Sequence, residues 1–383
     1  MAFWIFDCRF WITEKNKCTT IFQCGLVSLA PIMGNPKSKT CGEQRRTIEN
    51  LKREDMRDTM KARDAWAFAT FLITAFFLSV GAHAGQKDFQ KLTVGYTPIG
   101  GAAIPFFIAV EEKIFQKYGF EVTPVFMGGS PLINSAILAG EFPIGYTGGG
   151  AIISSRLAGS DLTAIASPLP VLTIDGWSKP EIRSVSDLRG KRIGVTRFGA
   201  SSYFAGLSML ESAGIKPSEV TFIQNGGVGE SYAALVGGRV DVCMIGYPFG
   251  LRAKKEGFHL LFRPLDTEYG LFPTAVIGAR ESWLKDGKNR RFTIDFLRAL
   301  NEGQRLAREN AVVTKRALGK FTRTENDAEL QGTFEFYKDA FSSTLRVVEK
   351  SMANALKFVE HPKAKGADVK QFYDNSLVDE AMR

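Results

Sequence analysis

The sequence VGYTPIGG at residues 94–101 returns in outline about a hundred residues later as IGVTRFGA, at residues 193–200. Two further pairs of segments repeat at nearly the same offset: GG at 128–129 with GG at 226–227, and ILAGEFPIG at 137–145 with LVGGRVDVC at 235–243. An offset shared by three pairs is typical of an internal repeat. The alternative explanation is that strand–helix–strand units resemble one another in general. We interpret the chain as two α/β lobes of similar plan.

Short β-like runs alternate with helical patterns from residue 91 onward. Strands are expected at 91–96, 121–127, 142–146 and 163–167, and helices at 105–117, 131–139 and 151–158. This alternation favours a largely parallel sheet covered by helices in each lobe. Beyond residue 281 the pattern is mostly helical, most clearly over 292–307 and 334–359.

Two stretches without helical period separate the lobes, at 171–180 and 263–273. The chain therefore leaves the first lobe, builds the second and returns. We expect residues 85–172 and 274–383 to form one lobe and residues 173–273 to form the other. Two crossing segments between two lobes make a hinge.

The composition is that of an ordinary globular protein. The 383 residues are 45% hydrophobic and 23% charged, with a net charge of +9. The basic residues are dispersed and form no block interleaved with aromatics, so we expect no nucleic-acid partner. Only Cys243 follows residue 41 among the five cysteines, which leaves that part of the chain without a disulfide framework. The earlier cysteines have no zinc-site spacing, and we expect no metal or cofactor.

An export signal is indicated well inside the chain. A basic start at 60–63 precedes an uncharged apolar run at 65–80, and Ala82-His83-Ala84 follows as a small-x-small cleavage site. We interpret residues 56–84 as a signal peptide cleaved after Ala84, and residues 1–55 as a non-native upstream extension. Because the apolar run is shorter than the roughly 20 residues of a membrane span, an uncleaved signal anchor is the less favoured alternative.

Turns rich in Gly, Ser and Thr follow the expected strands. Open α/β sheets bind ligands at the carboxyl ends of their strands, where helix N-termini present unpaired N–H groups. Ser130 is expected at a helix N-cap, with Pro131 at the first helical position. The turns in question are 97–101, 128–131, 147–150, 197–202, 225–229 and 246–248. Each glycine could serve only a tight turn, and each serine only a cap.

For three side chains in or beside these turns, the sequence leaves open whether they contact a ligand. Arg197 is the one cation in the turns, and it either pairs with an anionic ligand group or points into solvent. Tyr203 and Tyr247 either line the cleft or belong to the core. We favour the cleft for both tyrosines.

Familiar catalytic motifs are absent from residues 85–383. This part contains neither a G-x-S-x-G nucleophile elbow nor a P-loop. Its two histidines, His259 and His361, have no triad partner nearby in the sequence. Cys243 lies in the strand-like segment VDVCMIG, where a structural thiol is expected. The sequence does not indicate an enzyme.

Three long segments and the tail resemble periplasmic substrate-binding proteins of ABC transporters. The closest branch binds sulfonates, taurine, nitrate and thiamine-pyrimidine precursors. The segments are AILAGEFPIGYTGGGAII (136–153), IRSVSDLRGKRIGVTRFGASSYFAGLSMLESAGIKPSEVTFI (182–223), ALVGGRVDVCMIGYPF (234–249) and KAKGADVKQFYDNSLVDE (363–380). The resemblance covers about residues 90–383. It implies an α/β, two-lobed type II periplasmic binding protein fold with two hinge crossings and a ligand in the cleft.

The resemblance also implies ligand contacts in the turns. With the two turn residues Thr97 and Arg197 and with Tyr203, the candidate set is Thr97, Gly100, Ser130, Thr147, Gly148, Arg197, Ser201, Ser202, Tyr203, Asn225 and Tyr247. Three departures from the family pattern leave the ligand class open. The turn at 199–202 reads Gly-Ala-Ser-Ser where the family usually has a Gly-Ser-Ser-like turn. Pro143 stands where the second lobe has Asp241, and Gly149 stands where sulfonate binders often carry a polar side chain.

The expected function is capture of a small solute of sulfonate, nitrate or pyrimidine type in the periplasm. A monomer would deliver it to an ABC permease in the membrane. Two alternatives share the fold. One is an enzyme like the pyrimidine synthase of thiamine biosynthesis, whose histidine and cysteine-rich motif are not found here. The other is a sensory binding module.

Overall fold

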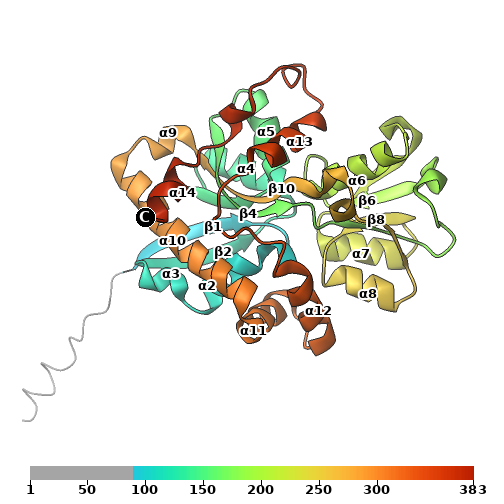
Figure 1. Ribbon diagram of the computed structural model, residues 1–383, viewed down its shortest axis with the longest axis horizontal. Helices are drawn as coiled ribbons and strands as arrows, with labels where there is room; N and C mark the ends of the chain where they lie inside the picture. The colour runs from blue at the N-terminus through green and yellow to red at the C-terminus, as the bar shows by residue number, and fades with distance from the viewer. Residues whose placement is uncertain (1–88) are drawn as a thin grey trace, which may run out of the picture. The chain divides into compact units, whose positions relative to one another are not determined.

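Two five-stranded mixed sheets organise residues 89–383, the part of the chain that the computed structural model describes (Figure 1). The expected signal peptide and upstream extension, residues 1–84, lie outside the described residues. The elements built around the two sheets are called the first and the second lobe below.

The first sheet has the strand order β2-β1-β3-β10-β4. β1 pairs in parallel with β2 and β3, whereas β10 is antiparallel to both β3 and β4. The late strand β10 therefore lies between two early strands. The strands are β1 (Gln90–Tyr96), β2 (Phe120–Phe126), β3 (Ile144–Thr147), β4 (Leu162–Val171) and β10 (Leu271–Arg280).

The second sheet repeats this plan with the order β7-β6-β8-β5-β9. β6 pairs in parallel with β7 and β8, and β5 is antiparallel to β8 and β9. The two repeated segments at 94–101 and 193–200 end β1 and β6, the central strand of each parallel trio. The strands are β5 (Asp175–Ser178), β6 (Arg192–Val195), β7 (Thr221–Gln224), β8 (Val242–Ile245) and β9 (His259–Phe262).

Paired glycines bring helix α4 (Ser130–Ala139) close to the first sheet. Gly95 of β1 is in register with Gly145 of β3. A Cβ on Gly145 would lie 2.5 Å from Cγ2 of Ile133, and one on Gly95 would lie 2.7 Å from the Phe142 ring. Because only hydrogen atoms fit there, the helix seats deeply, and Ser130 at its start is held at the carboxyl edge of the sheet.

The remaining helices of the first lobe come from both ends of the described chain. The predicted single helix at 105–117 is wrong, because the left-handed Lys113 (φ 54°) separates α2 from α3. The elements are η1 (Gly101–Ala103), α2 (Ile104–Glu111), α3 (Ile114–Lys117), α5 (Gly149–Leu157), α9 (Glu281–Leu284), α10 (Gly287–Glu309), α11 (Ala311–Thr322), α12 (Asp327–Tyr337), α13 (Glu349–Lys357), η6 (Val369–Phe372) and α14 (Ser376–Ala381).

The predicted helix at 334–359 is also wrong. α12 ends at Tyr337, and the chain is irregular until α13 begins at Glu349. Backbone groups of this irregular segment bond to β4: Ser342 N donates to the Pro168 carbonyl, and Ser167 N donates to the Leu345 carbonyl. These bonds between distant segments replace the intrahelical bonds that local periodicity favours.

Helices of the second lobe lie on both sides of its sheet (Figure 1). The aperiodic stretch 171–180 contains β5, so the outgoing crossing is reduced to residues 172–174. The return crossing, 263–270, contains two short 3₁₀ turns. The elements are η2 (Val185–Leu188), α6 (Ser201–Ser212), η3 (Pro217–Glu219), α7 (Val228–Val236), α8 (Phe249–Lys255), η4 (Pro264–Asp266) and η5 (Glu268–Gly270).

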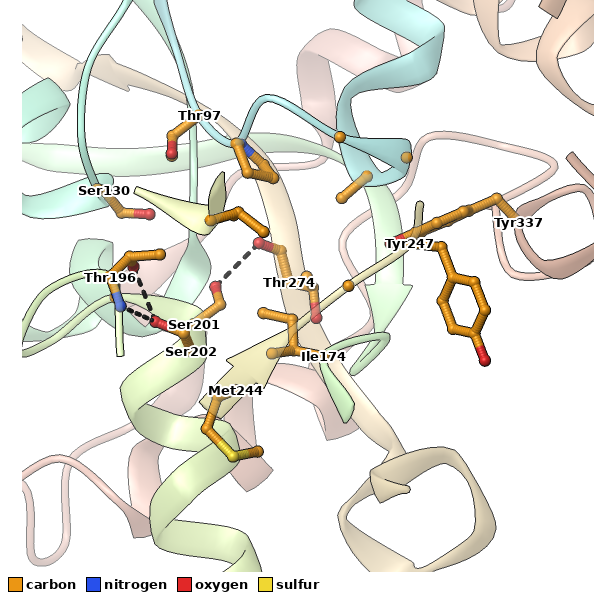
Figure 2. A pocket seen from close by; sticks show the side chains of 18 residues that line it. Thr97, Ser130, Ile174, Thr196, Ser201, Ser202, Met244, Tyr247, Thr274 and Tyr337 are labelled. Atoms are coloured by element: carbon orange, nitrogen blue, oxygen red, sulfur yellow. Dashed lines mark hydrogen bonds between the residues drawn. The ribbon is translucent and has the colours of Figure 1, made fainter. Parts of the chain in front are cut away.

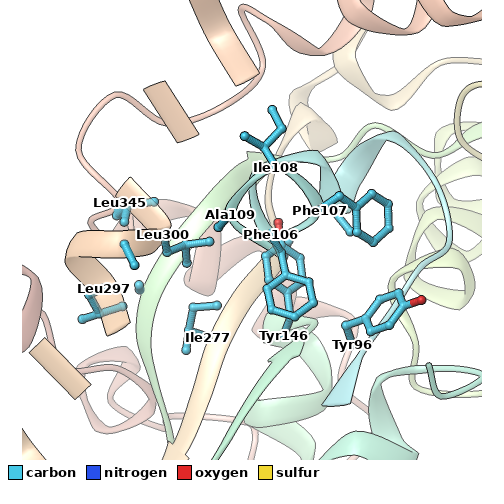
Figure 3. Packing of buried hydrophobic residues seen from close by; sticks show 14 of the residues in the cluster. Tyr96, Phe106, Phe107, Ile108, Ala109, Tyr146, Ile277, Leu297, Leu300 and Leu345 are labelled. Atoms are coloured by element: carbon cyan, nitrogen blue, oxygen red, sulfur yellow. The ribbon is translucent and has the colours of Figure 1, made fainter. Parts of the chain in front are cut away.

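An aromatic and aliphatic core fills the first lobe beneath α2 (Figure 3). Phe106 and Tyr146 are fully buried, with ring centroids 5.9 Å apart, and Phe107 stacks on Phe321 at 4.0 Å. Burying side chains of this size contributes about 1.5–3 kcal/mol each. This core therefore holds α2, and the turn that precedes it, firmly on the sheet.

A second apolar cluster runs from α4 and α5 in the first lobe to α6 in the second. The rings of Phe204 in α6 and Phe272 in β10 have centroids 5.6 Å apart. A Cβ on Gly150 of α5 would lie only 2.4 Å from the Phe204 ring. The two lobes are thus in direct apolar contact beside the crossings. None of the helices within residues 89–383 is long and apolar enough to cross a bilayer.

Asp241 joins three segments of the second lobe. Its carboxylate accepts bonds from the Arg192 side chain and backbone and from Lys179 Nζ at 2.8–3.0 Å. Bonding to Arg192, and then to Lys179, lowers the pKa of Asp241 below its ordinary value. The charge-assisted bonds are therefore kept above the unfolded pKa of about 4, and their contribution to stability is lost as the pH falls below it.

We expect Asp241→Asn to lower the free energy of unfolding by about 1.5–3 kcal/mol at neutral pH. Denaturant unfolding measures this, and the difference from wild type should shrink as the solution is acidified. Asp295→Asn is the control, because among residues 89–383 Asp295 forms an ion pair only with Arg298 of the same helix, with both side chains partly exposed. This substitution should change stability by less than about 0.5 kcal/mol. Equal effects of the two substitutions would contradict the prediction.

Candidate functional site

A pocket lies between the two lobes at the carboxyl ends of their parallel strands (Figure 2). The volume of the cavity is about 50 Å³. Its walls come from loops and helix N-termini rather than from long side chains. The lining residues are Thr97, Pro98, Gly100, Gly101, Ala102, Gly129, Ser130, Ile174, Thr196, Ala200, Ser201, Ser202, Val228, Met244, Gly246, Tyr247, Thr274 and Tyr337.

The first lobe supplies the turn after β1 and the start of α4. Thr97 and Gly100 line the pocket, as does Ser130, which is 3% exposed. Ser130 is the first residue of α4 and Gly129 is the N-cap, so the predicted N-cap position of Ser130 is wrong by one residue. Gly129 has φ 119°, a conformation that a serine rarely adopts. Glycine therefore takes the cap, and the Ser130 side chain is left at the pocket.

The second lobe supplies the turn after β6 and the start of α6. Ser202 Oγ accepts a bond from Thr196 N at 3.0 Å and shares another with Thr196 Oγ1 at 2.8 Å. Ser201 Oγ donates to the Thr274 carbonyl at 3.1 Å, which links α6 to the first strand residues of β10. Figure 2 shows these hydroxyls gathered on one side of the pocket with Thr97 and Ser130.

Apolar groups form the opposite side. Ile174 of the outgoing crossing and Met244 of β8 line it. The ring of Tyr247 points away from the serine and threonine hydroxyls (Figure 2) and stacks on Phe336 of α12, with centroids 4.2 Å apart. Tyr247 thus lines the pocket, as expected. Its ring, however, packs against α12 of the first lobe.

None of the residues lining this pocket carries a formal charge. Positive potential comes instead from the N-termini of α4, α6 and α7, whose first residues or caps line the pocket. Unpaired N–H groups at such ends bind oxygen-rich or anionic groups. The site therefore offers hydroxyls and backbone amides as its polar contacts.

Two candidates from the first lobe, Thr147 and Gly148, lie just behind this lining. Thr147 is buried and donates to Asn134 Oδ1 at 3.0 Å. A Cβ on Gly148 would lie 2.7 Å from Ser201 Oγ and 2.9 Å from Ser130 Oγ. Gly148 thus permits a serine hydroxyl from each lobe to approach the same point.

Three candidates from the second lobe also lie outside the lining. Tyr203 packs edge-to-face against Phe222, with centroids 5.0 Å apart. Asn225 donates to Ser231 Oγ at 3.4 Å within its own turn. Arg197 neither lines the pocket nor stays free, because its Nε donates to the Gly128 carbonyl of the first lobe at 3.0 Å.

Backbone contacts close the two lobes over the pocket. A Cβ on Gly128 would lie 2.2 Å from the carbonyl oxygen of Gly226 in the second lobe. On another side, Gly101 N donates to the Tyr247 carbonyl at 2.9 Å. With the Arg197 bond, these contacts describe a closed arrangement of the lobes.

Several lining residues were not identified by sequence reasoning. Thr196 stands next to the predicted turn at 197–202 and could have been included by extending it. Thr274 and Tyr337 come from segments more than a hundred residues from the turns of the first lobe. No local signal marks them, because only the return of β10 and the packing of α12 bring them to the pocket.

Other reactive groups lie away from the site. Cys243 is buried in β8, and burial raises the pKa of its thiol. Across residues 89–383, no group of three or more His, Cys, Asp or Glu side chains could hold a metal ion.

The model of a family described as NMT1/THI5 like matches residues 102–311 of this chain. The matched segment runs from the turn before α2 into α11 and contains most of the pocket.

A putative ABC transporter periplasmic binding protein of Brachyspira hyodysenteriae is 23% identical over 204 residues. The match covers 49% of this chain, and the chain spans only 58% of that relative's length.

Solved structures share the fold of the described part. A protein of Bordetella bronchiseptica RB50 is 19% identical with a TM-score of 0.69, over 76% of this chain and 96% of that one. The periplasmic aliphatic sulphonate binding protein SsuA of Escherichia coli is 21% identical with a TM-score of 0.58, over 76% and 99%. The periplasmic nitrate-binding protein NrtA of Synechocystis PCC 6803 is 12% identical with a TM-score of 0.61, over 77% and 88%. The predicted type II periplasmic binding protein fold is confirmed.

The contact between Gly128 and Gly226 generates a prediction about closure. In Gly128→Ala the new methyl group would meet the Gly226 carbonyl in the closed arrangement only, so we expect this variant to fold normally and to stay open. Small-angle X-ray scattering should show a larger radius of gyration than for wild type. Gly287→Ala is the control, because a Cβ there meets no atom within 4 Å. Identical scattering of both variants would show that Gly128 does not limit closure.

Proposed function

Because the chain belongs to the NMT1/THI5 like family, we propose that it is an extracytoplasmic solute-binding protein that delivers a small solute to an ABC permease. The observation that carries this proposal is the pocket that both lobes build together. Neither lobe alone encloses it, so a solute held there is bound by the closed arrangement and released by the open one.

The lining favours a small, oxygen-rich solute. Six serine and threonine residues and three helix N-termini line the same space, with an apolar wall opposite. A single water needs about 10–15 Å³ of such space, so roughly 50 Å³ suits a small solute. Solutes of sulfonate, nitrate or pyrimidine type match this chemistry. The sulphonate- and nitrate-binding proteins among the similar structures support the same class.

The lining favours binding over catalysis. Tyr247 and Tyr337 are the only titratable residues that line the pocket. Burial raises the pKa of both phenols, which makes them poor bases near neutral pH. An acid–base or nucleophilic reaction needs a group whose pKa suits proton transfer. An enzyme of the same fold is therefore the less supported alternative.

Closure supplies the binding mechanism. Contacts across the lobes, such as the bond from Arg197 Nε to the Gly128 carbonyl, hold the turns before α4 and α6 together, so that both helix N-termini reach the solute. Excluding water from this space strengthens hydrogen bonds to a polar ligand. The relative from Brachyspira, named as an ABC transporter component, supports a membrane permease as the recipient and the periplasm as the place of capture.

A solute screen tests the proposal directly. Thermal unfolding of the chain would be followed with nitrate, methanesulfonate, taurine and a hydroxymethylpyrimidine, each at a concentration far above the expected Kd. A ligand present at 100 times its Kd stabilises the folded state by about 2.7 kcal/mol, which raises the melting temperature. Calorimetry would then give the stoichiometry. If none of these compounds raises the melting temperature or releases heat on titration, the proposed solute class is wrong.

Ser130 provides the sharpest test of the site itself. Its hydroxyl lies at the pocket and at the N-terminus of α4. For a solute found in the screen, we expect Ser130→Ala to lower affinity by about 0.5–1.5 kcal/mol, the net value of one hydrogen bond. Ser135→Ala in the same helix is the control, because its hydroxyl bonds to the Pro131 carbonyl on an exposed face. Calorimetric Kd values that are equal for the two variants would remove Ser130 from the site.

A further inference from the structure

A buried carboxylate lies where the chain enters the second lobe, and the solute-binding mechanism above does not use it. Asp175 is the first residue of β5, directly after the outgoing crossing, and is 0% exposed. Arg263 directly follows β9 and begins the return crossing. The two strands are neighbours in the second sheet, so both crossings meet at this pair of residues.

The pair is strongly constrained by burial. Asp175 Oδ2 accepts bonds from Arg263 Nε and Nη2, both at 3.3 Å. Asp175 Oδ1 is buried without a hydrogen-bond partner among the described residues. A buried charge that loses its partner is strongly destabilising. The Arg263 guanidinium is therefore held at this carboxylate and cannot move to solvent without leaving the charge uncompensated.

Arg263 passes this constraint to the first lobe. Its Nη2 donates to Tyr247 Oη at 2.9 Å. The Tyr247 ring stacks on Phe336 of α12, and the Arg263 guanidinium lies 5.8 Å from the centroid of the same ring. The Tyr247 carbonyl, in turn, accepts the bond from Gly101 N. One ion pair thus orients the residue through which the second lobe contacts two elements of the first.

We propose that Asp175 and Arg263 form a clasp that ties the two crossings together and sets the angle at which the lobes close. Both are positioning residues, since neither lines the pocket. They act on solute binding through Tyr247. The inference deepens the proposed function and rests on it for its biological meaning.

The clasp responds to protonation of the carboxyl. Burial raises the pKa of Asp175 to about 7, although Arg263 acts to lower it. The other titratable or charged groups that face it are Asp266 on the return crossing, Tyr247 after β8 and Tyr337 of α12. Above this pKa the ionised carboxylate holds Arg263. Below it the neutral acid releases the guanidinium, whose side chain is already 29% exposed.

Hydrogen exchange of the solute-free full chain tests the clasp. Two amides report on it: Leu172 N, which donates to the Gly270 carbonyl between the crossings at 2.8 Å, and Gly101 N, which donates across the lobes. Protection factors would be measured by mass spectrometry between about pH 5.5 and 8.5, which brackets the titration of Asp175. Amides of β1 serve as the internal reference. A raised native pKa makes the folded state bind the proton of Asp175 more tightly than the unfolded chain does. Acidification therefore stabilises the whole fold, and the protection of the β1 amides should rise as the pH falls.

We expect wild-type protection at both amides to fall roughly tenfold on acidification through pH 7, a change typical of coupled sites. In Asp175→Asn the protection of both amides should be low and independent of pH. Arg263→Gln should show the same low, pH-independent protection. Asp161→Asn is the matched control. Asp161 pairs with Arg280 at the far end of β4 and β10. Burial acts to raise the pKa of Asp161, but hydrogen bonds from Ser282 and Arg280 outweigh it, so the pKa lies below its ordinary value. This control should keep the wild-type profile.

Each outcome decides the matter. A wild-type profile that does not change with pH, or an Asp175→Asn profile equal to wild type, would overturn the clasp even if Arg263→Gln failed to fold. Because no solute is present, such a failure leaves the solute-binding proposal standing. A failed solute screen likewise leaves the clasp standing.

Discussion

The antiparallel pairing of β10 with both β3 and β4 is the interaction on which the rest of the structure depends. β10 follows the whole second lobe in the chain, yet it is inserted between two strands that precede that lobe. The hydrogen-bond ladder therefore forces the outgoing and returning crossings to run side by side, as the bond from Leu172 N to the Gly270 carbonyl shows. With both crossings at one edge, the carboxyl ends of the two parallel trios face a common space.

The absence of side chains at two glycines helps to shape that space. Glycines at 128 and 148 remove the methyl groups that would keep the lobes apart or separate the hydroxyls of Ser130 and Ser201. Close approach of backbones brings helix N-termini together, and their partial charges replace charged side chains. The pocket therefore presents fixed dipoles, whose relative orientation depends on the angle between the lobes.

Local and tertiary information contributed unequally to the fold. The four strands expected in the first repeat match β1 to β4 within a few residues, because hydrophobic period and turn residues are local properties. The predicted helix at 334–359 failed because the irregular residues Ser342 and Leu345 bond to β4. Those partners lie far away in the sequence and leave no periodic signal. The Ser130 cap failed by one residue, because Gly129 alone tolerates the φ that the turn requires.

The sequence by itself determined the two-lobed plan, the order of the elements and the turns from which the pocket is built. Only the tertiary structure decided which side chains of those turns reach the pocket: Ser130 and Ser201 do, whereas Arg197 instead joins the lobes. It also brought in Thr274 and Tyr337 from the returning part of the chain. The physical reason is that a turn's conformation depends on neighbouring residues, while access to a shared pocket depends on packing between segments that the sequence keeps far apart.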